Sequence, residues 1–561
     1  MFYCEVFFVN RNAESHFALL PHVDISRSTF DRSHTLKTSF NAGDLIPFYV
    51  DEVLPGDTFD VKTSKVIRMP SLITPIMDNI FLDTYFFFVP NRLCWEHWRE
   101  LNGENTQSAW IPAVEYEVPQ ITSPATTGWS IGSIADYFGI PTGIPGLSVN
   151  ALPFRAYALI CNEWFRDENL TDPLVIPTDD AVVAGTNGTN YITDVAKGGA
   201  PFVAAKYHDY FTSALPSPQK GPDVTIPVGT TGPSPVYSTL DRVPNASTMN
   251  TSSLQMSGAS VGNPFVLGVS PGSDSIGNVF ASSFSGLTGG SSSSPQNLWA
   301  YPTSDSVAVA TINQLRQAFQ IQKLYEKDAR GGTRYIEILK AHFGVTSPDA
   351  RLQRPEYLGG NRIPINVNQI VQQSQTTDQS PQGNPVGLSL TSDTHADFRK
   401  SFVEHGFVIG LMVARYDHTY QQGLERFWSR KDRFDYYWPV FANLGEQAIK
   451  NKEIYAQGSA VDDEVFGYQE AWADYRFKPN HVTGEMRSQS PQTLDSWHLA
   501  DKYDKLPSLS DSWIREDKTP IDRVIAVTSS ITHQFFADIY IKCRSTRPMP
   551  MYSVPGLVDH H

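Results

Sequence analysis

The stretch Phe535–Arg544, FFADIYIKCR, carries the most regular pattern in the sequence. Every second residue is apolar or small, and the residues between them are mostly polar or aromatic. One set is Phe535, Ala537, Ile539, Ile541 and Cys543; the other is Phe536, Asp538, Tyr540, Lys542 and Arg544. Successive side chains of a β-strand point to opposite faces, so this period of two predicts a strand near the C-terminus with one buried face.

Two stretches near the other end of the chain also have strand character. Leu45–Val61, LIPFYVDEVLPGDTFDV, contains two short β-like runs separated by a Pro55-Gly56 turn. Ile80–Val89, IFLDTYFFFV, is almost wholly apolar, which predicts a strand covered on both faces. We expect the first and last strands to pair in a mainly β, antiparallel jelly-roll β-sandwich, with long loop insertions and a few short helices.

Two segments have the periodicity of helices. Within Leu152–Arg166 an apolar residue recurs at every fourth position, and Pro153 sits early, where a helix tolerates proline. A second helix begins at Thr311, with Gln314 in the position of a capping box, and ends at Gly331-Gly332. We expect both helices to pack on the β core.

Composition divides the chain into four parts. Residues 1–42 are interpreted as an N-terminal arm, extended and not packed, and residues 43–214 as the first part of the jelly-roll core. Residues 215–302 are rich in Ser, Thr, Gly and Pro but retain aromatic residues, which favours an ordered insertion that packs on itself or on neighbouring copies. Residues 303–561 supply the second part of the core and the C-terminal tail.

The net charge of −15 over 561 residues disfavours a protein that coats nucleic acid with its whole surface. Cys4, Cys94, Cys161 and Cys543 lie far apart in the sequence, so we expect neither a disulfide framework nor a zinc site. No apolar run is long enough to span a membrane, and the opening MFYCEVFFV lacks the basic start and cleavage site of a signal peptide.

Motifs for catalysis or metal binding are weak. Gly258–Gly262 and Gly268–Gly272 match G-x-S-x-G, but neither follows a strand and precedes a helix, as a nucleophile elbow requires. Asp179-Asp180 and Asp462-Asp463-Glu464 are interpreted as solvated loop acids, because adjacent residues of an extended chain point apart. The histidines show no metal-ligand spacing. We therefore expect no catalytic residue, no metal and no cofactor.

The best candidate for nucleic-acid binding is the group Lys542, Arg544 and Arg547, with Tyr540 nearby. Cations can neutralise phosphates while an aromatic ring stacks on unpaired bases. An ordinary solvated strand end explains these residues about as well. Arg27, Arg32 and Lys37 form a weaker second candidate, for which an ordered interface segment is the preferred interpretation.

Six long stretches resemble the major capsid proteins of the microviruses, and of their gokushovirus branch in particular. They include FNAGDLIPFYVDEVLPGDTF and MDNIFLDTYFFFVPNRLCWEHW, and together they cover most of the chain: Phe40–Phe59, Met77–Trp98, Asn150–Leu170, Thr311–Leu339, Gly406–Ile449 and Phe466–Ser488. The insertion at 215–302 is similar to the branch's protrusion in position and composition, not in sequence.

The resemblance implies a non-enzymatic subunit that joins copies of itself in a T=1 icosahedral shell around circular single-stranded DNA. It implies a virion protein assembled in the host cytoplasm, with other virion proteins and, given the acidic chain, a small basic DNA-binding protein as partners. The insertion would then touch a host receptor. Trp428, Trp438 and Trp472 are expected either at subunit interfaces or in the core.

Two other classes of protein remain as alternatives. A trimeric receptor-binding fibre or adhesin would suit the Ser- and Gly-rich insertion, but not the long flanking β core. A secreted β-sandwich enzyme that acts on polysaccharide would also be rich in aromatic residues, Gly and Ser. That enzyme would need a signal peptide and a pair of cleft carboxylates, and neither is visible in the sequence.

Overall fold

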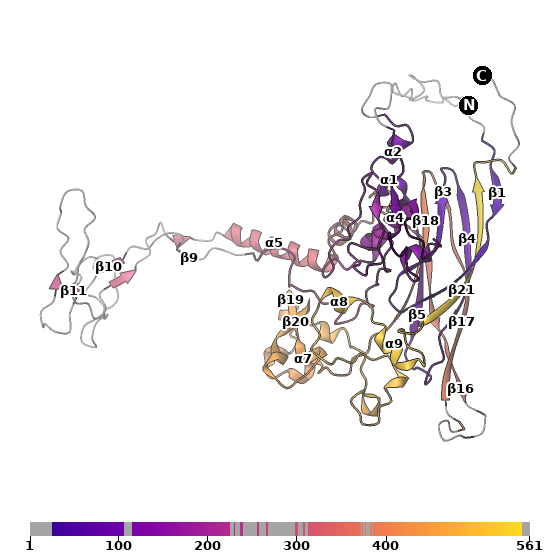
Figure 1. Cartoon of the computed structure of the whole chain (residues 1–561). Helices are drawn as coiled ribbons and strands as arrows, with labels where there is room; N and C mark the ends of the chain where they lie inside the picture. Colours follow the sequence, from indigo (N-terminus) through magenta and orange to yellow (C-terminus); the bar gives the residue numbers. More distant parts are fainter. Residues whose placement is uncertain are drawn as a thin grey trace, which may run out of the picture. The chain divides into compact units, whose positions relative to one another are not determined.

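The structure is a computed structural model that describes residues 25–105, 115–224, 312–371, 373, 376, 382, 383 and 385–552, together with the backbone of short strands between 229 and 308. By contacts the chain divides into two units, residues 1–219 with 326–561, and residues 220–325. The first unit contains a β-sandwich of two antiparallel sheets (Figure 1).

The first sheet contains the strand whose pattern opened the sequence analysis. Its order is β1-β21-β4-β17-β16, and β2 also pairs with β21. These strands are β1 (Ser28–Asp31), β2 (His34–Phe40), β4 (Thr58–Arg68), β16 (Val367–Val371), β17 (Pro385–Ser401) and β21 (Phe535–Arg547). Strands from both ends of the chain therefore lie side by side, which confirms the predicted pairing.

The second sheet has the order β15-β5-β18-β3. Its strands are β3 (Ile46–Val53), β5 (Ile80–Pro90), β15 (Glu356–Ile365) and β18 (Gly406–Tyr416). The chain crosses from the second sheet to the first between β3 and β4, and back to the second between β4 and β5. It crosses from the first sheet to the second between β17 and β18, and after a long insertion it returns to the first sheet as β21. The first passage turns at Gly56, whose φ of 89° favours glycine. These crossings make the predicted jelly-roll sandwich.

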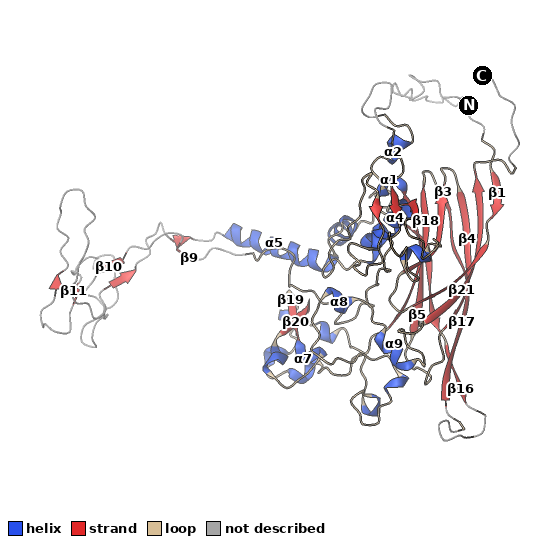
Figure 2. Ribbon diagram, viewed as in Figure 1, coloured by secondary structure: helices blue, strands red, loops and turns tan. Residues whose placement is uncertain are grey.

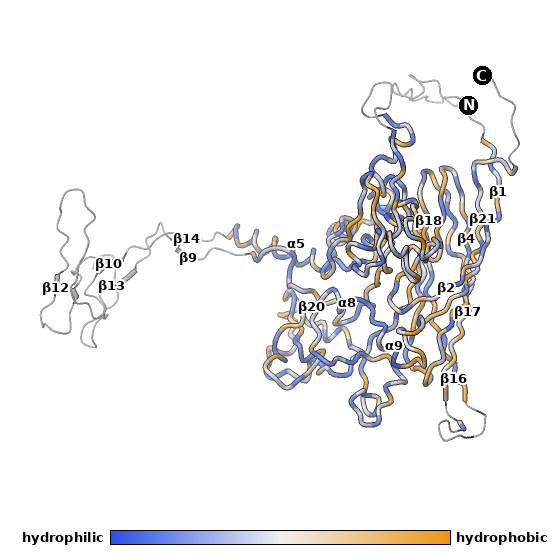
Figure 3. Tube along the Cα trace, viewed as in Figure 1, coloured by the Kyte–Doolittle hydropathy of each residue, from blue (hydrophilic) through white to orange (hydrophobic). Residues whose placement is uncertain are grey.

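The main core lies between the two sheets. Most strands contribute their inward residues, and those of β21 are Phe535, Ala537, Ile539, Ile541 and Cys543, none more than 5% exposed. Hydrophobic segments follow the strands of both sheets (Figure 3). The amphipathic pattern of β21 thus gives one buried and one exposed face, as the sequence predicts.

A layer of insertions covers the outer face of the second sheet. Phe87, Val89, Ile409 and Leu411 pack there against α4 (Leu152–Ile160) and its surroundings, so β5 is buried on both faces, as predicted. Helices α1 (Asn91–Cys94), α2 (Trp98–Leu101) and α4 lie on this side of the sandwich (Figure 2). The predicted helix over Leu152–Arg166 is confirmed, with a π-type turn over Cys161–Phe165 after α4.

Shorter elements complete the first unit. A three-stranded sheet joins β6 (Gln120–Thr122), β7 (Ser148–Asn150) and β8 (Val183–Ala184), and a hairpin joins β19 (Glu446–Lys450) and β20 (Val465–Glu470). The remaining short helices are α3 (Ile134–Tyr137), α6 (Tyr335–Ile338), α7 (Asn451–Ile454), α8 (Asp511–Ile514) and α9 (Thr519–Val524).

Most of the insertion predicted at 215–302 lies outside the described residues. Besides residues 215–224, the structure describes a nested ladder of short antiparallel strand pairs in and just after this segment: β9 (Gly229–Thr230) with β14 (Val307–Ala308), β10 (Val236–Ser238) with β13 (Leu298–Ala300), and β11 (Gln255–Met256) with β12 (Phe265–Val266). Both G-x-S-x-G matches, and the start of the chain through residue 24, also lie outside the described residues.

One expectation needs correction. Part of the supposed arm, Ser28–Phe40, is not free but forms β1 and β2, because its backbone completes the hydrogen bonds of β21. The second helix, α5 (Ile312–Gly331), forms as predicted.

Candidate nucleic-acid interface

The outer face of the first sheet has a basic character that contrasts with the acidic chain. The alternation of β21 directs Lys542 and Arg544 to this face, where both are exposed. Neighbouring strands add further exposed cations and a smaller set of carboxylates. The cations of this basic sheet face are Lys37, Lys62, Arg68, Arg399, Lys542 and Arg544; the carboxylates are Asp31, Asp60 and Asp538.

Lys62 of β4 lies directly opposite Lys542 of β21 in the antiparallel register. Side chains in such a pair have Cβ atoms only about 5 Å apart, and like charges there repel each other. Within the described residues neither lysine forms an ion pair with a carboxylate. A bound phosphate between the two ammonium groups would turn this repulsion into attraction, so the pair has the chemistry of an anion site.

Arg544 lies opposite Asp60 on one neighbouring strand and Asp31 on the other. Hydrogen bonds from Ser33 are the largest cause that lowers the pKa of Asp31, and the charges of Arg544 and Lys542 lower it further. The positive charge of Arg544 is thus partly neutralised by these two carboxylates of neighbouring strands. Its position on the exposed face nevertheless joins it to the Lys62–Lys542 pair.

Two aromatic side chains lie on the same face of β21. Tyr540 is 44% exposed and Phe536 is 38% exposed, and both share the outward set with Lys542. Aromatic rings stack on unpaired bases regardless of base identity. The face therefore combines phosphate-neutralising and base-stacking groups, the pairing of functions found in proteins that bind single strands without sequence preference.

Arg547, the third predicted binding residue, has a structural contact instead. Its guanidinium forms ion pairs with Asp57 at 3.5 Å and Asp51 at 3.8 Å, and it donates a hydrogen bond to the carbonyl oxygen of Glu52. Asp57 is fully buried, so this arginine compensates a charge that would otherwise be isolated. The structure therefore brings together Lys542 and Arg544 but not Arg547.

The weaker candidates in the supposed arm are likewise engaged. Arg32 donates two hydrogen bonds to Asp51, and Lys37 contacts Asp538 at 3.6 Å in an exposed pair. Burial would lower the pKa of Arg32, but its carboxylate partner outweighs burial and raises it. Arg27 is exposed outside the strands. Arg32 thus holds β1 and β2 to β3, which fits the preferred interpretation as an ordered segment.

Sequence reasoning missed Lys62, Arg68 and Arg399. The predicted strand character of this region ended at Val61, and no strand was predicted over β17. Each cation occupies an outward position of its strand. A longer search for period-two alternation would have placed them on one face, but only the register of the sheet shows that Lys62 meets Lys542.

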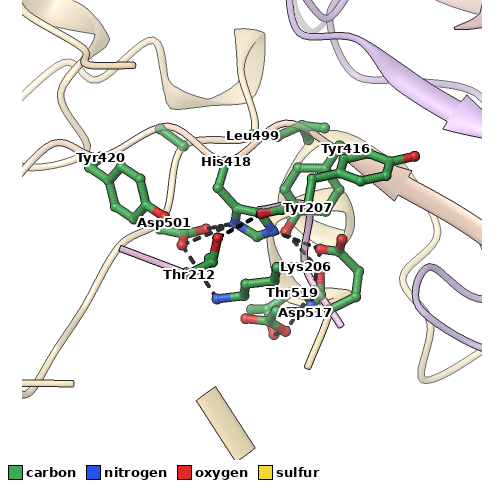
Figure 4. A network of polar contacts seen from close by, with 12 residues as sticks. Lys206, Tyr207, Thr212, Tyr416, His418, Tyr420, Leu499, Asp501, Asp517 and Thr519 are labelled. Atoms are coloured by element: carbon green, nitrogen blue, oxygen red, sulfur yellow. Dashed lines mark hydrogen bonds and ion pairs between the residues drawn. The ribbon is translucent and has the colours of Figure 1, made fainter. Parts of the chain in front are cut away.

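A cluster of buried ionisable groups could be mistaken for an active site (Figure 4). His418 lies between Asp501, at 3.0 Å, and Glu516, at 2.9 Å, and Lys206 approaches Asp501 at 3.7 Å. Burial would lower the pKa of His418, but the two carboxylates outweigh it and raise the pKa to about 10. A histidine held in its charged form cannot act as a general base near neutral pH. The cluster joins four segments of the chain.

The other acidic and sulfur groups have local roles. Asp462 accepts hydrogen bonds from the backbone amides of residues 457–459, and Asp463 pairs with Lys450 and Lys452. Cys94, Cys161 and Cys543 are free and buried. In the part of the chain that the structure describes, no group of three or more His, Cys, Asp or Glu side chains could hold a metal ion. None of the helices described there is both long and apolar enough to cross a bilayer.

The jelly-roll sandwich is one of the architectures found in viral capsid proteins. The family comparison agrees: residues 18–557 match the family described as "Capsid protein (F protein)". The chain belongs to this family, the major capsid proteins of the microviruses, as the sequence resemblance predicts. It is accordingly a structural protein and not an enzyme.

Three curated relatives, each named "Capsid protein VP1", are similar over nearly their whole length. The protein of Chlamydia phage 1 is 46% identical, over 97% of this chain and 98% of its own length. That of Bdellovibrio phage phiMH2K is 44% identical, over 98% of both chains. That of Spiroplasma virus 4 is 43% identical, over 97% of this chain and 98% of its own length.

Proposed function

We propose that copies of this chain form a T=1 icosahedral shell around a circular single-stranded DNA genome, with the basic sheet face turned toward the DNA. The observation that carries the proposal is the Lys62–Lys542 pair on the exposed sheet. The second sheet cannot play this part, because its outer face is buried under the insertion layer. Phosphates would neutralise the two lysines, and Tyr540 would stack on a base.

The shell needs further partners to balance charge. The chain carries −15 overall, so a genome enclosed by many copies meets cations only on restricted surfaces. We expect a small basic DNA-binding protein, together with other virion proteins, to neutralise the remaining phosphates. Assembly would take place in the host cytoplasm, and the insertion at 215–302 would form the surface protrusion that contacts a host receptor.

The double variant Lys62→Gln/Lys542→Gln tests the DNA contact. We expect it to form shells with less nuclease-protected DNA per particle, because each copy loses two phosphate contacts. Binding of purified subunits to a single-stranded oligonucleotide should also depend less on salt. The slope of log K against log salt should fall in magnitude by about 1.4, since each contact with single-stranded DNA contributes about 0.7.

A matched control, Lys340→Gln/Lys505→Gln, removes the same charge from exposed positions outside the sheet. It should package and bind DNA like the wild type. An unchanged salt slope in the Lys62/Lys542 variant, or an equal fall in the control, would show that the sheet face does not contact the genome.

A further inference from the structure

A second exposed surface of the first unit is aromatic. Its members come from residues 427–438 and 475–477, and each is between 43% and 69% exposed. The aromatic surface consists of Phe427, Trp428, Phe434, Tyr436, Tyr437, Trp438, Tyr475 and Phe477. The sequence predicts three tryptophans either in the core or at subunit interfaces. Trp472 is buried, whereas Trp428 and Trp438 belong to this surface.

Contacts join these side chains into one patch. The guanidinium of Arg430 lies over the ring of Tyr475 at 4.3 Å and over that of Tyr436 at 5.5 Å. Tyr437 packs against Tyr475, and the indole N–H of Trp438 donates a hydrogen bond to the carbonyl oxygen of Arg433. The rings are therefore held in position before any partner binds, which lowers the entropy cost of association.

A pocket of about 350 Å³ opens beside these rings. Phe427, Tyr475 and Phe477 form its exposed wall, and the buried rings of Phe211 and Tyr420 line its interior. Buried aromatic pockets are where the strongest contacts of protein interfaces concentrate. This pocket is large enough to receive an apolar side chain.

The arginines and the lysine that line the pocket are each paired with a carboxylate, which suits a protein partner better than a nucleic acid. Arg430 pairs with Asp474, Arg426 lies 3.7 Å from Glu453, and Lys478 lies 3.6 Å from Glu425. Each of these cations already has a carboxylate partner and has little charge left for a phosphate. The lysines of the Lys62–Lys542 pair, by contrast, form no ion pair with a carboxylate of the described residues, so the basic sheet face and the aromatic surface differ in their available charge.

From these features we infer that the aromatic surface is covered in the shell by a second copy of this chain, with an apolar side chain of that copy in the pocket. At roughly 200 Å² for each aromatic side chain and about half of that exposed, the eight rings present on the order of 800 Å². That is the share one partner contributes to an interface of standard size. Monomeric proteins rarely expose so much contiguous apolar area. The inference rests on the proposed shell.

The variants Trp428→Ser and Phe477→Ser test the inference, since both side chains belong to the aromatic surface and are 69% and 50% exposed. Sedimentation velocity and electron microscopy should show at least about ten-fold fewer closed particles than the wild type forms, with folded subunits left in solution. Phe343→Ser, which removes an aromatic side chain that is 72% exposed elsewhere, is the matched control and should assemble normally.

Hydroxyl-radical footprinting of the wild type supplies a readout that needs no variant. Trp428 and Trp438 should be oxidised rapidly in dissociated subunits and be protected in particles. Normal assembly of Trp428→Ser, an equal defect in Phe343→Ser, or unprotected tryptophans in particles would overturn the inference. A variant that assembles but loses DNA would assign the surface to the genome instead. A wild type that forms no closed particles would overturn the proposed shell itself.

Discussion

At the scale of single residues, the fold depends on charges that are buried and paired. His418, Asp501, Glu516 and Lys206 join loop segments that are far apart in the sequence, and all four are nearly inaccessible. Taking such charges out of water is costly, so their mutual attraction must offset a large desolvation penalty. Removing one of them leaves the others uncompensated.

The variant His418→Gln should therefore lower the free energy of unfolding by about 3–5 kcal/mol near neutral pH. The pKa of His418 is raised to about 10, above its ordinary 6.5, so its contribution is complete below about pH 6.5 and is lost as pH rises toward 10. Urea unfolding of isolated subunits across this range should show wild-type stability falling and the variant changing less. Parallel pH curves for the two proteins would contradict this account.

At the scale of elements, β21 connects the fold to the candidate site. Its inward residues fill the core between the sheets, and its outward residues form part of the basic sheet face. The same period of two explains both roles, because a strand has two faces that can be specified independently. Substitution of an inward residue of β21 should accordingly lower the stability of the subunit, whereas substitution of an outward residue should weaken DNA binding.

Ile539 and Tyr540 provide this comparison. Ile539 is fully buried, so Ile539→Ala should cost about 2–5 kcal/mol of subunit stability and leave the DNA affinity of folded subunits unchanged. Tyr540→Ala removes a side chain that is 44% exposed and should weaken binding to a single-stranded oligonucleotide by about 1–3 kcal/mol with little loss of stability. Denaturant titration and oligonucleotide binding measure the two effects. Equal loss of stability in both variants would contradict the assigned faces.

The sequence predicts those elements whose pattern is local. The alternation of β21, the apolar run of β5, the Pro55-Gly56 turn and the helix at Leu152 all follow from neighbouring residues, and each forms as expected. Contacts between distant segments leave no local signal. The polar strands of Ser28–Phe40 were taken for a free arm because only β21, at the far end of the chain, gives them a partner.

The candidate site could be predicted only in part, again because contacts between distant segments leave no local signal in the sequence. Composition near the C-terminus pointed to Lys542, Arg544 and Arg547, but it could not show that Arg547 pairs with buried Asp57. Nor could it show that Lys62 lies opposite Lys542, which requires the register of β4 and β21. The buried position of His418 between two carboxylates likewise depends on loops from separate parts of the sequence.

At the scale of the whole molecule, the three outer surfaces differ in character. Insertions cover the second sheet, paired charges accompany the aromatic surface, and the first sheet exposes like charges opposite each other. These differences suit a subunit of a closed container, which needs lateral contacts with its copies and an inner face toward the genome. The basic sheet face would then turn toward the genome, and the aromatic surface toward a neighbouring copy.

Electron cryomicroscopy of assembled particles tests the orientation most directly. The account predicts a closed T=1 shell in which β21 and β4 line the inner surface, with density for nucleic acid near Lys62 and Lys542. A shell in which the basic sheet face points outward, or is buried between subunits with no nucleic acid beside it, would contradict the account.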